Sequence, residues 1–487
     1  MHHIRPLMLL LTIALVISPA LAQDDVPTIY IYNNSGTLQF DAGGSDPVVL
    51  EEITNHIVEQ IGVRPETIVP PGRGPVATEK LNLLLGSSDP IDLFQTPGPG
   101  YWHDYADAII PINDLLEEYG QNILQVIPEN QWAQMTDADG NIMGIPRSTP
   151  TSPYITWVRQ DWLDELGLEV PTTLEELEAT IEAFQAHNPD AFVATRPQDI
   201  TWSTLAGFTP NGRSNWLDPN DGMVKPWVLQ PGVKDWLTKL NEWWNAGYFY
   251  PETFTNFDAP EVFRTCNLGV WMAWYSRITL ITPQIESNCE GIEWARTSIV
   301  GPEGYIATSR PQNASAYVIT RKAQNPEAVM KFMDWVYHAD TTDNQLTARY
   351  GIKGTHWDYQ DPETRTVEVY DSGYVSEYML PNLNIEIRYS VLDPARAWHV
   401  QYLGSTLIDL SDAKKPFDAD ISYNLSRIAE ETPYLGDIQR LMDEQTILFI
   451  TGARPLDQFD DFINELNMAG IGDWVNALTA QYNEFAG

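Results

Sequence analysis

Basic residues are scarce in this chain. It carries 28 Lys and Arg residues against 67 Asp and Glu residues, which gives a formal net charge of −39 at pH 7. A negative field of this size repels phosphate backbones and anionic lipid surfaces. We therefore expect no nucleic-acid partner, and we interpret the charge as a solvated acidic surface that keeps the protein in solution.

Long hydrophobic runs are missing beyond the first residues, since no later segment approaches the about 20 residues that span a bilayer. At the start, Arg5 precedes an apolar run over 7–17, and residues 18–22 end in the small residues of an A-x-A pattern. This order is typical of a secretory signal peptide. We predict that residues 1–22 are removed and that the mature chain is secreted across the cytoplasmic membrane, to the periplasm or the exterior.

Cysteine is almost absent, with only Cys266 and Cys289 in the whole chain. No cysteine stands at the predicted cleavage site, so we expect no lipid anchor on an N-terminal cysteine. In an oxidising compartment the two thiols are expected to form a disulfide, which stabilises a fold by roughly 3 kcal/mol for a loop of this length. Two unrelated buried thiols remain the alternative.

Sequence motifs of enzymes and metal sites are missing as well. The chain has no H-E-x-x-H, no G-x-S-x-G and no P-loop lysine motif. Two acidic turns resemble calcium loops, but the EF-hand spacing places Met135 and Leu217 where the first carboxylate belongs. We expect no catalytic residue, no metal and no cofactor. A secreted carbohydrate-active hydrolase or lyase is the alternative, and it requires two carboxylates that face each other across a cleft.

Strand-like and helix-like segments alternate after the signal peptide. Residues 28–32, 66–69 and 91–95 are β-branched or apolar, and 47–62 and 76–85 have helical spacing of apolar residues. This order predicts a parallel sheet covered by helices on both faces. Ligands of such sheets bind beyond the carboxyl ends of the strands.

Polar residues follow two of these predicted strands and are candidate ligand contacts. They are Asn33 and Asn34 after the first strand, and Gln95 and Thr96 after the third. Ordinary turn chemistry is the equally weighted alternative for all four.

A set of short motifs in fixed order resembles the extracellular solute-binding proteins of carbohydrate ABC importers, especially long members related to maltose- and alginate-binding receptors. The motifs are Arg159-x-Asp161-Trp162-Leu163-x-x-Leu166-Gly167-Leu168, Pro171-x-Thr173-Leu174-x-Glu176-Leu177 with Phe184, Trp243-Trp244-Asn245-Ala246-Gly247, Pro251-Glu252, Gly269-Val270-Trp271-Met272, Gly301-Pro302-Glu303-Gly304, Asn325-Pro326-Glu327-Ala328, Tyr350-Gly351-Ile352 and Phe449-Ile450-Thr451-Gly452. Trp162, Leu163, Leu166 and Leu177 are expected to pack, not to bind ligand.

The resemblance implies an α/β fold of the two-lobed, type II periplasmic-binding-protein kind. Each lobe is a mainly parallel sheet flanked by helices, with a ligand cleft at the hinge. We expect lobe 1 to comprise residues 26–152 and 313–388, and lobe 2 residues 153–312 and 389–487. The resemblance also implies a monomeric receptor that binds a sugar or oligosaccharide and delivers it to the permease subunits of the importer. A receptor that feeds a chemosensor remains an alternative.

Sugars expose apolar C–H faces and a rim of hydroxyl groups, so their receptors use aromatic planes and planar polar groups. The chain supplies 17 Trp and 22 Tyr, most of them expected in the core. The further candidates lie where the chain is expected to turn near the cleft, and a packing role is the alternative for each: Trp102, Arg147, Trp202, Trp216, Trp274, Tyr275, Arg277, Trp357 and Trp398. Arg147 and Arg277 also suit a carboxylate, although a neutral oligosaccharide is the favoured ligand.

The chain departs from many long relatives at residues 187–191. The sequence His-Asn-Pro-Asp-Ala lacks the glycine and most of the oxygen ligands of their calcium loop. We therefore expect no structural calcium there.

Overall fold

The computed structural model describes residues 26–33, 45–72, 74–97, 102–127, 129–137, 139–147, 154–257, 259–274, 288–297, 299–302, 315–362, 366–370 and 423–486, together with Ile285, Gly373, Tyr374 and Tyr378. The signal-peptide prediction and the candidates Asn34, Tyr275, Arg277 and Trp398 lie outside these residues, as does the side chain of Trp274.

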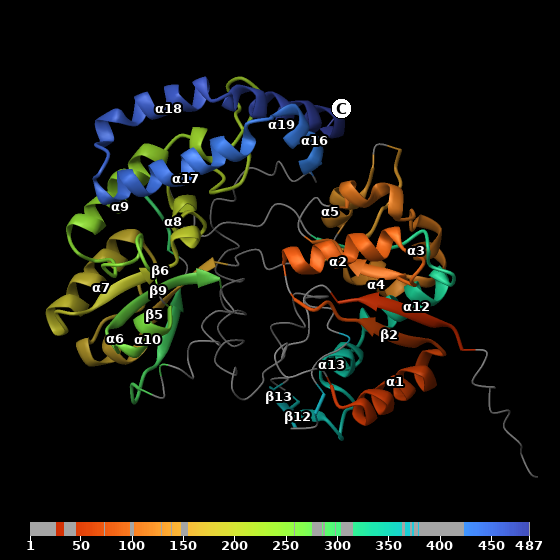
Figure 1. Ribbon diagram of the computed structural model, residues 1–487. Coiled ribbons are helices and arrows are strands. Elements are labelled where there is room, and N and C mark those ends of the chain that lie inside the picture. Colours follow the sequence, from red (N-terminus) through yellow and green to blue (C-terminus); the bar gives the residue numbers. More distant parts are fainter. Residues whose placement is uncertain are drawn as a thin grey trace, which may run out of the picture.

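Two separate sheets organise the chain, each with helices around it (Figure 1). Sheet 1 has the order β2-β1-β3-β11-β4, and its strands are β1 (Thr28–Tyr32), β2 (Arg64–Ile68), β3 (Leu93–Gln95), β4 (Ile145–Pro146) and β11 (Ala316–Ile319). Sheet 2 has the order β10-β5-β9-β6, and its strands are β5 (Tyr154–Arg159), β6 (Phe192–Thr195), β9 (Leu268–Trp274) and β10 (Trp294–Thr297). The fold is therefore two-lobed and α/β, as predicted.

Each sheet contains one strand that runs against its neighbours. In sheet 1, β1, β2 and β3 are parallel, while β11 is antiparallel to both β3 and β4. In sheet 2, β6 and β9 are parallel, while β5 is antiparallel to both β9 and β10. The remaining strands of each sheet thus share one direction, which confirms mainly parallel sheets.

The reversed strands are the ones that the chain enters after changing lobes. The chain leaves sheet 1 after β4 and enters sheet 2 at β5, and it leaves sheet 2 after β10 and re-enters sheet 1 at β11. The first residues of β5 and β11 consequently lie at the same edge as the carboxyl ends of the other strands. We call this edge of each sheet its carboxyl edge.

Helices cover both sheets and bury two separate hydrophobic cores. Around sheet 1 lie α1 (Pro47–Ile61), α2 (Pro75–Gly86), α3 (Asn113–Tyr119), α4 (Gln121–Val126), α5 (Glu129–Trp132), α12 (Pro326–Val336) and α13 (Asp343–Tyr350). Around sheet 2 lie α6 (Gln160–Leu166), α7 (Leu174–His187), α8 (Ile200–Thr204), α9 (Val233–Asn245), α10 (Ala259–Arg264), α17 (Leu435–Thr451) and α18 (Phe459–Met468). A chain of this length is too long to fold around a single hydrophobic core, so separate cores are expected.

Local sequence signals explain the ends of several helices. Thr173 caps α7, because its side chain accepts from the Glu176 N–H while the Glu176 carboxylate accepts from the Thr173 N–H, a complete capping box. Gly62 and Gly167 end α1 and α6 with φ of 66° each, the left-handed conformation that glycine adopts at little cost. Leu177 and Trp162 are buried in the core, which confirms their predicted packing role.

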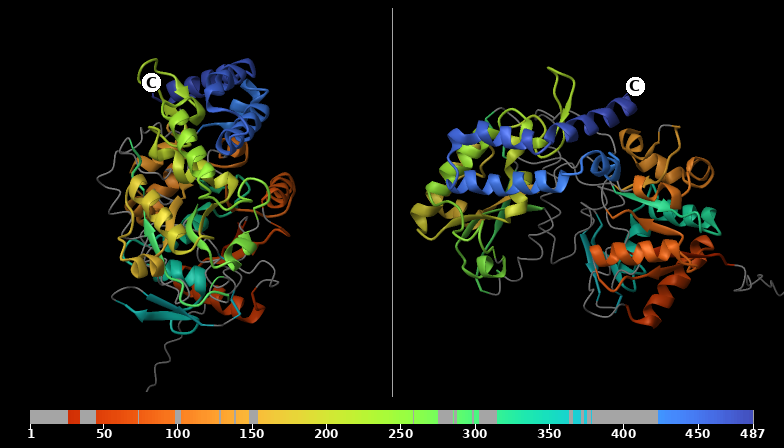
Figure 2. Two further views of the ribbon diagram at one scale, coloured as in Figure 1. Left: turned by 90° about the vertical axis from the view of Figure 1, so that its left-hand side faces the viewer. Right: turned by 45° about the horizontal axis from the view of Figure 1, so that its top comes forward.

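The last helices form a module beside the two sheets. It contains α16 (Leu425–Glu431), α19 (Ile471–Ala486) and the hairpin of β7 (Trp216–Leu217) and β8 (Val224–Lys225). Figures 1 and 2 show α16 and α19, in blue, reaching from the body of sheet 2 toward the body of sheet 1. There α16 contacts η3 (His103–Ala108), a 3-10 helix of the sheet 1 body.

Candidate functional site

The carboxyl edge of sheet 1 gathers the polar residues predicted from the strand ends. Asn33, Gln95 and Thr96 are buried, with 4%, 7% and 1% of their surface exposed. The Asn33 N–H donates to the Ile68 carbonyl, and the Thr96 hydroxyl accepts from the Ala316 N–H at 2.9 Å. Thr96 and the Asn33 backbone therefore hold neighbouring strands together at this edge.

Arg147 follows β4 at the same edge and has an unusual environment. Its backbone N–H donates to the Ser315 carbonyl at 2.7 Å, while its Nε is buried without a hydrogen-bond partner. Its electrostatic neighbours are the buried Tyr317 and Tyr337. Burial lowers the pKa of the Arg147 guanidinium and raises the pKa of both phenols. Among the described residues, no carboxylate forms an ion pair with Arg147.

The carboxyl edge of sheet 2 carries a stacked aromatic pair. Tyr154 opens β5 and lies in register with Trp274, the last residue of β9. The Tyr154 ring stacks on the Trp202 ring of α8, with centroids 5.6 Å apart and planes 6° from parallel. Both side chains are only partly buried.

A short stretch after β6 places Trp202 at this edge. β6 ends at Thr195, and an ion pair of 2.6 Å between Arg196 and Asp199 closes the turn into α8. Ile200 is buried in the core of lobe 2, and Thr204 accepts a hydrogen bond of 2.8 Å from the Trp236 indole. α8 is thereby fixed at both ends.

Arg213 completes the cluster at sheet 2. Its guanidinium carbon lies 5.0 Å from the centroid of the Trp202 ring, a cation–π distance. Burial lowers its pKa, against the opposing fields of Asp443, Tyr154 and Asp199. Within the described part of the chain, neither carboxylate forms an ion pair with it.

Three tryptophans predicted as ligand contacts, Trp102, Trp216 and Trp357, are buried. Trp102 and Trp357 expose 2% and 0% of their surface, and their indole N–H groups donate to the carbonyls of Gln134 (3.0 Å) and Gly351 (2.6 Å). Trp216 is buried in the β7–β8 hairpin, 5.9 Å from the Lys225 ammonium. The burial of all three, and the hydrogen-bonded indoles of Trp102 and Trp357, favour the packing role that the sequence left open as the alternative.

Two residues of the cluster at sheet 2, Tyr154 and Arg213, were not predicted from the sequence. Tyr154 was not among the candidates, although a strand that begins after a lobe crossing places its first residue at the carboxyl edge. Arg213 had one usable signal, a positive charge inside the turn Asn211-Gly212-Arg213 in a chain with few cations.

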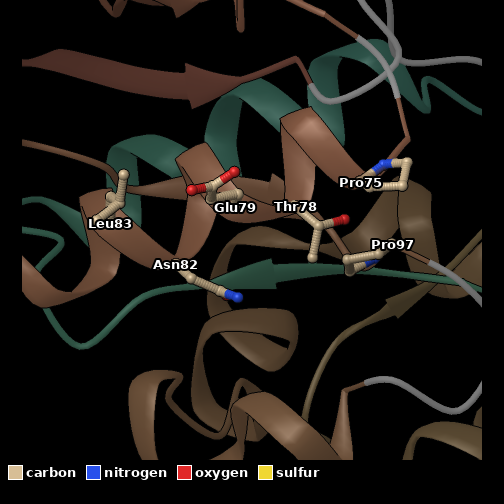
Figure 3. Close-up of a pocket in the computed structure, with 6 residues that line it drawn as sticks. All are labelled: Pro75, Thr78, Glu79, Asn82, Leu83 and Pro97. Carbon is tan, nitrogen blue, oxygen red and sulfur yellow. The ribbon is translucent and has the colours of Figure 1, made fainter.

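A pocket of about 680 Å³ opens along α2 in lobe 1 (Figure 3). Thr78, Glu79 and Asn82 supply polar groups, and Pro97 lies across from the helix. Because Pro97 directly follows Thr96, one end of this pocket reaches the carboxyl edge of sheet 1. Its described lining residues offer hydrogen-bonding groups and include no aromatic ring.

Metal ligands do not gather in the described residues, where no three His, Cys, Asp or Glu side chains lie close enough to hold an ion. At the former calcium-loop position, Asn188 accepts from the Asp190 N–H and donates to Asn267, which makes an ordinary turn. No helix in the described ranges is long and apolar enough to cross a membrane.

The family model for bacterial extracellular solute-binding proteins matches residues 66–342. The chain belongs to this family. Residues of both sheets fall within the match. The membership agrees with the two-lobed fold and with the resemblance seen in the sequence.

Two curated relatives of this solute-binding protein match parts of the chain. FusA of Streptococcus pneumoniae, a fructooligosaccharide ABC transporter substrate-binding protein, is 31% identical over 145 residues, 26% of each chain. YtcQ of Bacillus subtilis, a polygalacturonan/rhamnogalacturonan-binding protein, is 24% identical over 245 residues, 47% of this chain and 48% of YtcQ. The matches thus span about a quarter and about half of these relatives.

Solved structures match over almost the whole length. The alginate-binding protein AlgQ2 without calcium has a TM-score of 0.64 at 18% identity, covering 94% of this chain and 98% of its own. An extracellular solute-binding protein from Bifidobacterium longum subsp. infantis has a TM-score of 0.67 at 14% identity, covering 96% and 100%. At these identities the likeness establishes the fold.

Proposed function

We infer that this solute-binding protein is the extracytoplasmic substrate-binding component of an ABC importer. It binds a sugar or oligosaccharide between its lobes and delivers it to the permease subunits. The observation that carries the proposal is the parallel stack of Tyr154 and Trp202 at the carboxyl edge of sheet 2. Aromatic planes with a polar group nearby suit the apolar face and hydroxyl rim of a sugar ring.

The relatives support the same ligand class. FusA and YtcQ are both described as binding saccharides, and FusA as part of an ABC transporter. None of the relatives named above is described as an enzyme, which supports a receptor without catalytic residues or cofactor over a hydrolase or lyase.

The proposed binding mode uses both lobes, residues 26–152 with 313–388 and residues 153–312 with 389–487. Some ligand contacts form only when the lobes close, so the ligand binds the closed form more tightly than the open form. This difference in affinity shifts the equilibrium toward the closed form. The proposed contacts from lobe 1 are Asn33, Asn34, Gln95, Thr96 and Arg147. Those from lobe 2 are Tyr154, Trp202, Arg213, Trp274, Tyr275, Arg277 and Trp398. The protein acts as a monomer, and residues 1–22 direct its export and are removed from the mature chain.

A thermal-shift screen of the mature protein against neutral and acidic oligosaccharides tests the proposal. A saccharide at 100 times its Kd is expected to stabilise the folded state by about 2.7 kcal/mol. X-ray scattering on the best ligand is expected to show compaction. A panel without any shift, or conversion of a saccharide to products, overturns the proposal, and the second result favours the hydrolase or lyase.

The importer and chemosensor alternatives differ in their partner. Proteoliposomes with the permease and ATPase subunits are expected to take up the saccharide only when this protein and ATP are present. Uptake that does not depend on this protein contradicts a role in import.

A further inference from the structure

Most described arginines that are at least partly buried have a carboxylate partner. Arg64, Arg159 and Arg196 form ion pairs of 2.6, 2.5 and 2.6 Å with acidic residues. Arg427 and Arg454 do so at 2.6 and 2.9 Å. This is expected in a chain with 67 acidic residues and 28 basic ones, where acceptors for a guanidinium are abundant.

Arg147 and Arg213 depart from this pattern. Neither forms an ion pair or a side-chain hydrogen bond within the described residues, although both are partly buried. A cation held away from water without a partner costs free energy, and it persists only where the surrounding structure imposes it. Removing such a group relieves that cost, whereas removing a partner of an ion pair does not.

The two guanidinium groups occupy corresponding places. Arg147 follows the carboxyl end of β4 in sheet 1, and Arg213 lies over the Trp202 ring at the carboxyl edge of sheet 2. Each lobe thus brings one cation, unpaired with any described carboxylate, to the edge at which α/β sheets bind ligands. The Arg213 cation also lies beside the aromatic stack proposed for sugar rings.

We propose that the ligand is an acidic oligosaccharide whose carboxylates are bound by Arg147 and Arg213 while its rings stack on Tyr154 and Trp202. This proposal rests on the proposed function. A guanidinium binds a carboxylate through two parallel N–H···O hydrogen bonds, which explains why arginine stands at both places. Because each lobe supplies one cation, a ligand with at least two uronic acid residues favours the closed form.

The acidic surface does not oppose this specificity. Asp199 is already bound to Arg196 at 2.6 Å, so its charge is largely compensated. Asp443 is exposed on α17, where water and salt screen it. Among the described groups around the stack, Arg213 therefore supplies a positive charge that no ion pair compensates.

Isothermal titration calorimetry with matched probes tests the proposal. The probes are trimers of galacturonate, mannuronate, guluronate and glucuronate, the methyl ester of each, and neutral malto- and fructo-trisaccharides. We expect at least one acidic trimer to bind, and its methyl ester, which keeps the rings but loses the charge, to bind at least 10-fold more weakly.

Charge-removing variants identify the residues. Arg213→Gln and Arg147→Gln are expected to weaken binding of the acidic trimer at least 10-fold, and Arg213→Lys to fall between wild type and Arg213→Gln. Arg264→Gln in lobe 2 and Arg321→Gln in lobe 1 remove the same charge from exposed positions and are expected to stay within 2-fold of wild type. The melting temperature of the ligand-free Arg213→Gln protein is expected not to fall, which separates a binding role from a structural one.

The outcomes distinguish the two proposals. Binding of a neutral trisaccharide without any acidic one, or equal affinity for acid and methyl ester, overturns the acidic ligand and leaves the sugar receptor standing. Wild-type affinity in both Arg147→Gln and Arg213→Gln also overturns it. Absence of binding to every saccharide overturns the proposed function and this inference together.

Discussion

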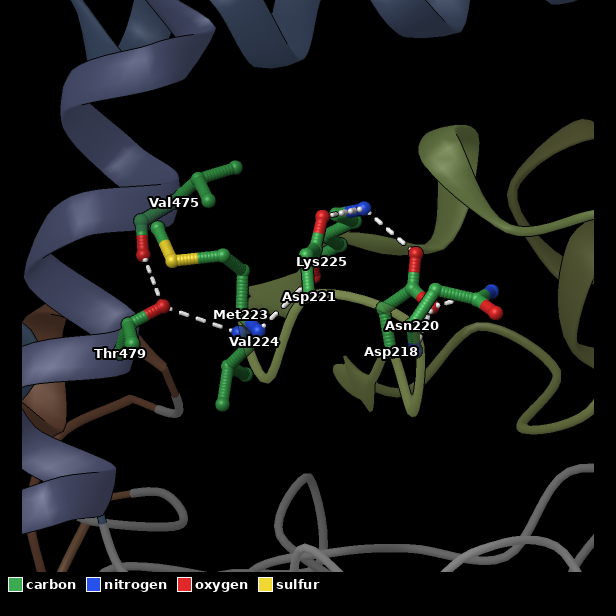
Figure 4. Close-up of polar contacts among 8 residues, drawn as sticks. All are labelled: Asp218, Asn220, Asp221, Met223, Val224, Lys225, Val475 and Thr479. Carbon is green, nitrogen blue, oxygen red and sulfur yellow. Dashed lines mark hydrogen bonds and ion pairs between the residues drawn. The ribbon is translucent and has the colours of Figure 1, made fainter.

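The Thr479 hydroxyl on α19 accepts a hydrogen bond of 2.9 Å from the Val224 N–H in β8, 255 residues earlier in the chain (Figure 4). The same hydroxyl donates to the Val475 carbonyl at 2.7 Å. This buried contact joins the β7–β8 hairpin of lobe 2 to the last helix. It explains how a short hairpin is held in a fixed position.

Thr479→Val is therefore expected to destabilise the protein by about 1–3 kcal/mol, because it leaves a buried N–H without an acceptor. Urea unfolding followed by tryptophan fluorescence measures the change. Thr479→Ser keeps the hydroxyl and is expected to recover most of the loss. Equal stability of Thr479→Val and wild type contradicts the role of this hydrogen bond.

The hairpin turn also predicts a pH dependence. The Lys225 ammonium lies 2.5 Å from Asp218 Oδ2 and 2.6 Å from Asp221 Oδ2. The hydrogen bonds from Lys225 lower the pKa of both carboxyls below 3.8. Partial burial lowers the pKa of Lys225 itself, but the hydrogen bonds to Asp218 and Asp221 outweigh burial and raise this pKa above 10.5. The two carboxylates therefore stabilise the fold above about pH 4, and this contribution is lost as the pH falls through their lowered pKa values.

Melting temperatures of wild type and Asp218→Asn from pH 3 to 7 test this expectation. Asp218→Asn is expected to be less stable near pH 7, with the difference shrinking as the pH falls below 4. On the alkaline side, the contribution of Lys225 is present below pH 10.5 and is lost as the pH rises through its raised value. A difference between the two proteins that is constant across pH 3 to 7 contradicts the ion pairs.

Trp202 and Trp357 are expected to respond oppositely to truncation. Trp202 is partly exposed in the stack, so Trp202→Ala is expected to lower saccharide affinity at least 10-fold with a small loss of stability. Trp357 is fully buried, so Trp357→Ala is expected to cost about 3–5 kcal/mol through the cavity it leaves. Calorimetry and urea unfolding on both variants measure the two effects, and equal loss of affinity in both contradicts the assignment.

The disulfide predicts a further loss of stability on reduction. Cys266 and Cys289 are bonded in the structure, with Cα atoms 5.6 Å apart and a separation of 23 positions in sequence. Closing a loop of this length stabilises the folded state by roughly 3 kcal/mol. The double variant Cys266→Ala with Cys289→Ala is expected to lose about this amount in urea unfolding, and mass spectrometry of the unreduced protein is expected to show no free thiol.

Local signals predicted the strands and helices near sheet 1 within a few residues. The strand expected over 66–69 occupies Arg64–Ile68, and the helix expected over 76–85 is Pro75–Gly86. Alternating hydrophobicity and caps such as Thr173 act over a few residues, so they can be recognised without knowing the fold. The family motifs extended this to the two-lobed architecture.

The candidate site was predicted less well because burial depends on contacts between distant segments. Trp102 and Trp202 look alike in sequence, but the Trp102 indole meets the Gln134 carbonyl, while Trp202 meets Tyr154 at a sheet edge. Arg147 was predicted because the chain was expected to turn there, whereas Arg213 was missed because its turn contacts α8 only in the folded chain.

The amino-acid sequence by itself determined the fold class, the family and the overall charge, since composition, periodicity and ordered motifs do not depend on long-range packing. Only the tertiary structure decided which aromatic residues are core and which arginines have no carboxylate partner among the described residues. The physical reason is that ion pairing and exposure are properties of groups brought together by folding. Two cations with the same local sequence chemistry can differ entirely in the partners that surround them.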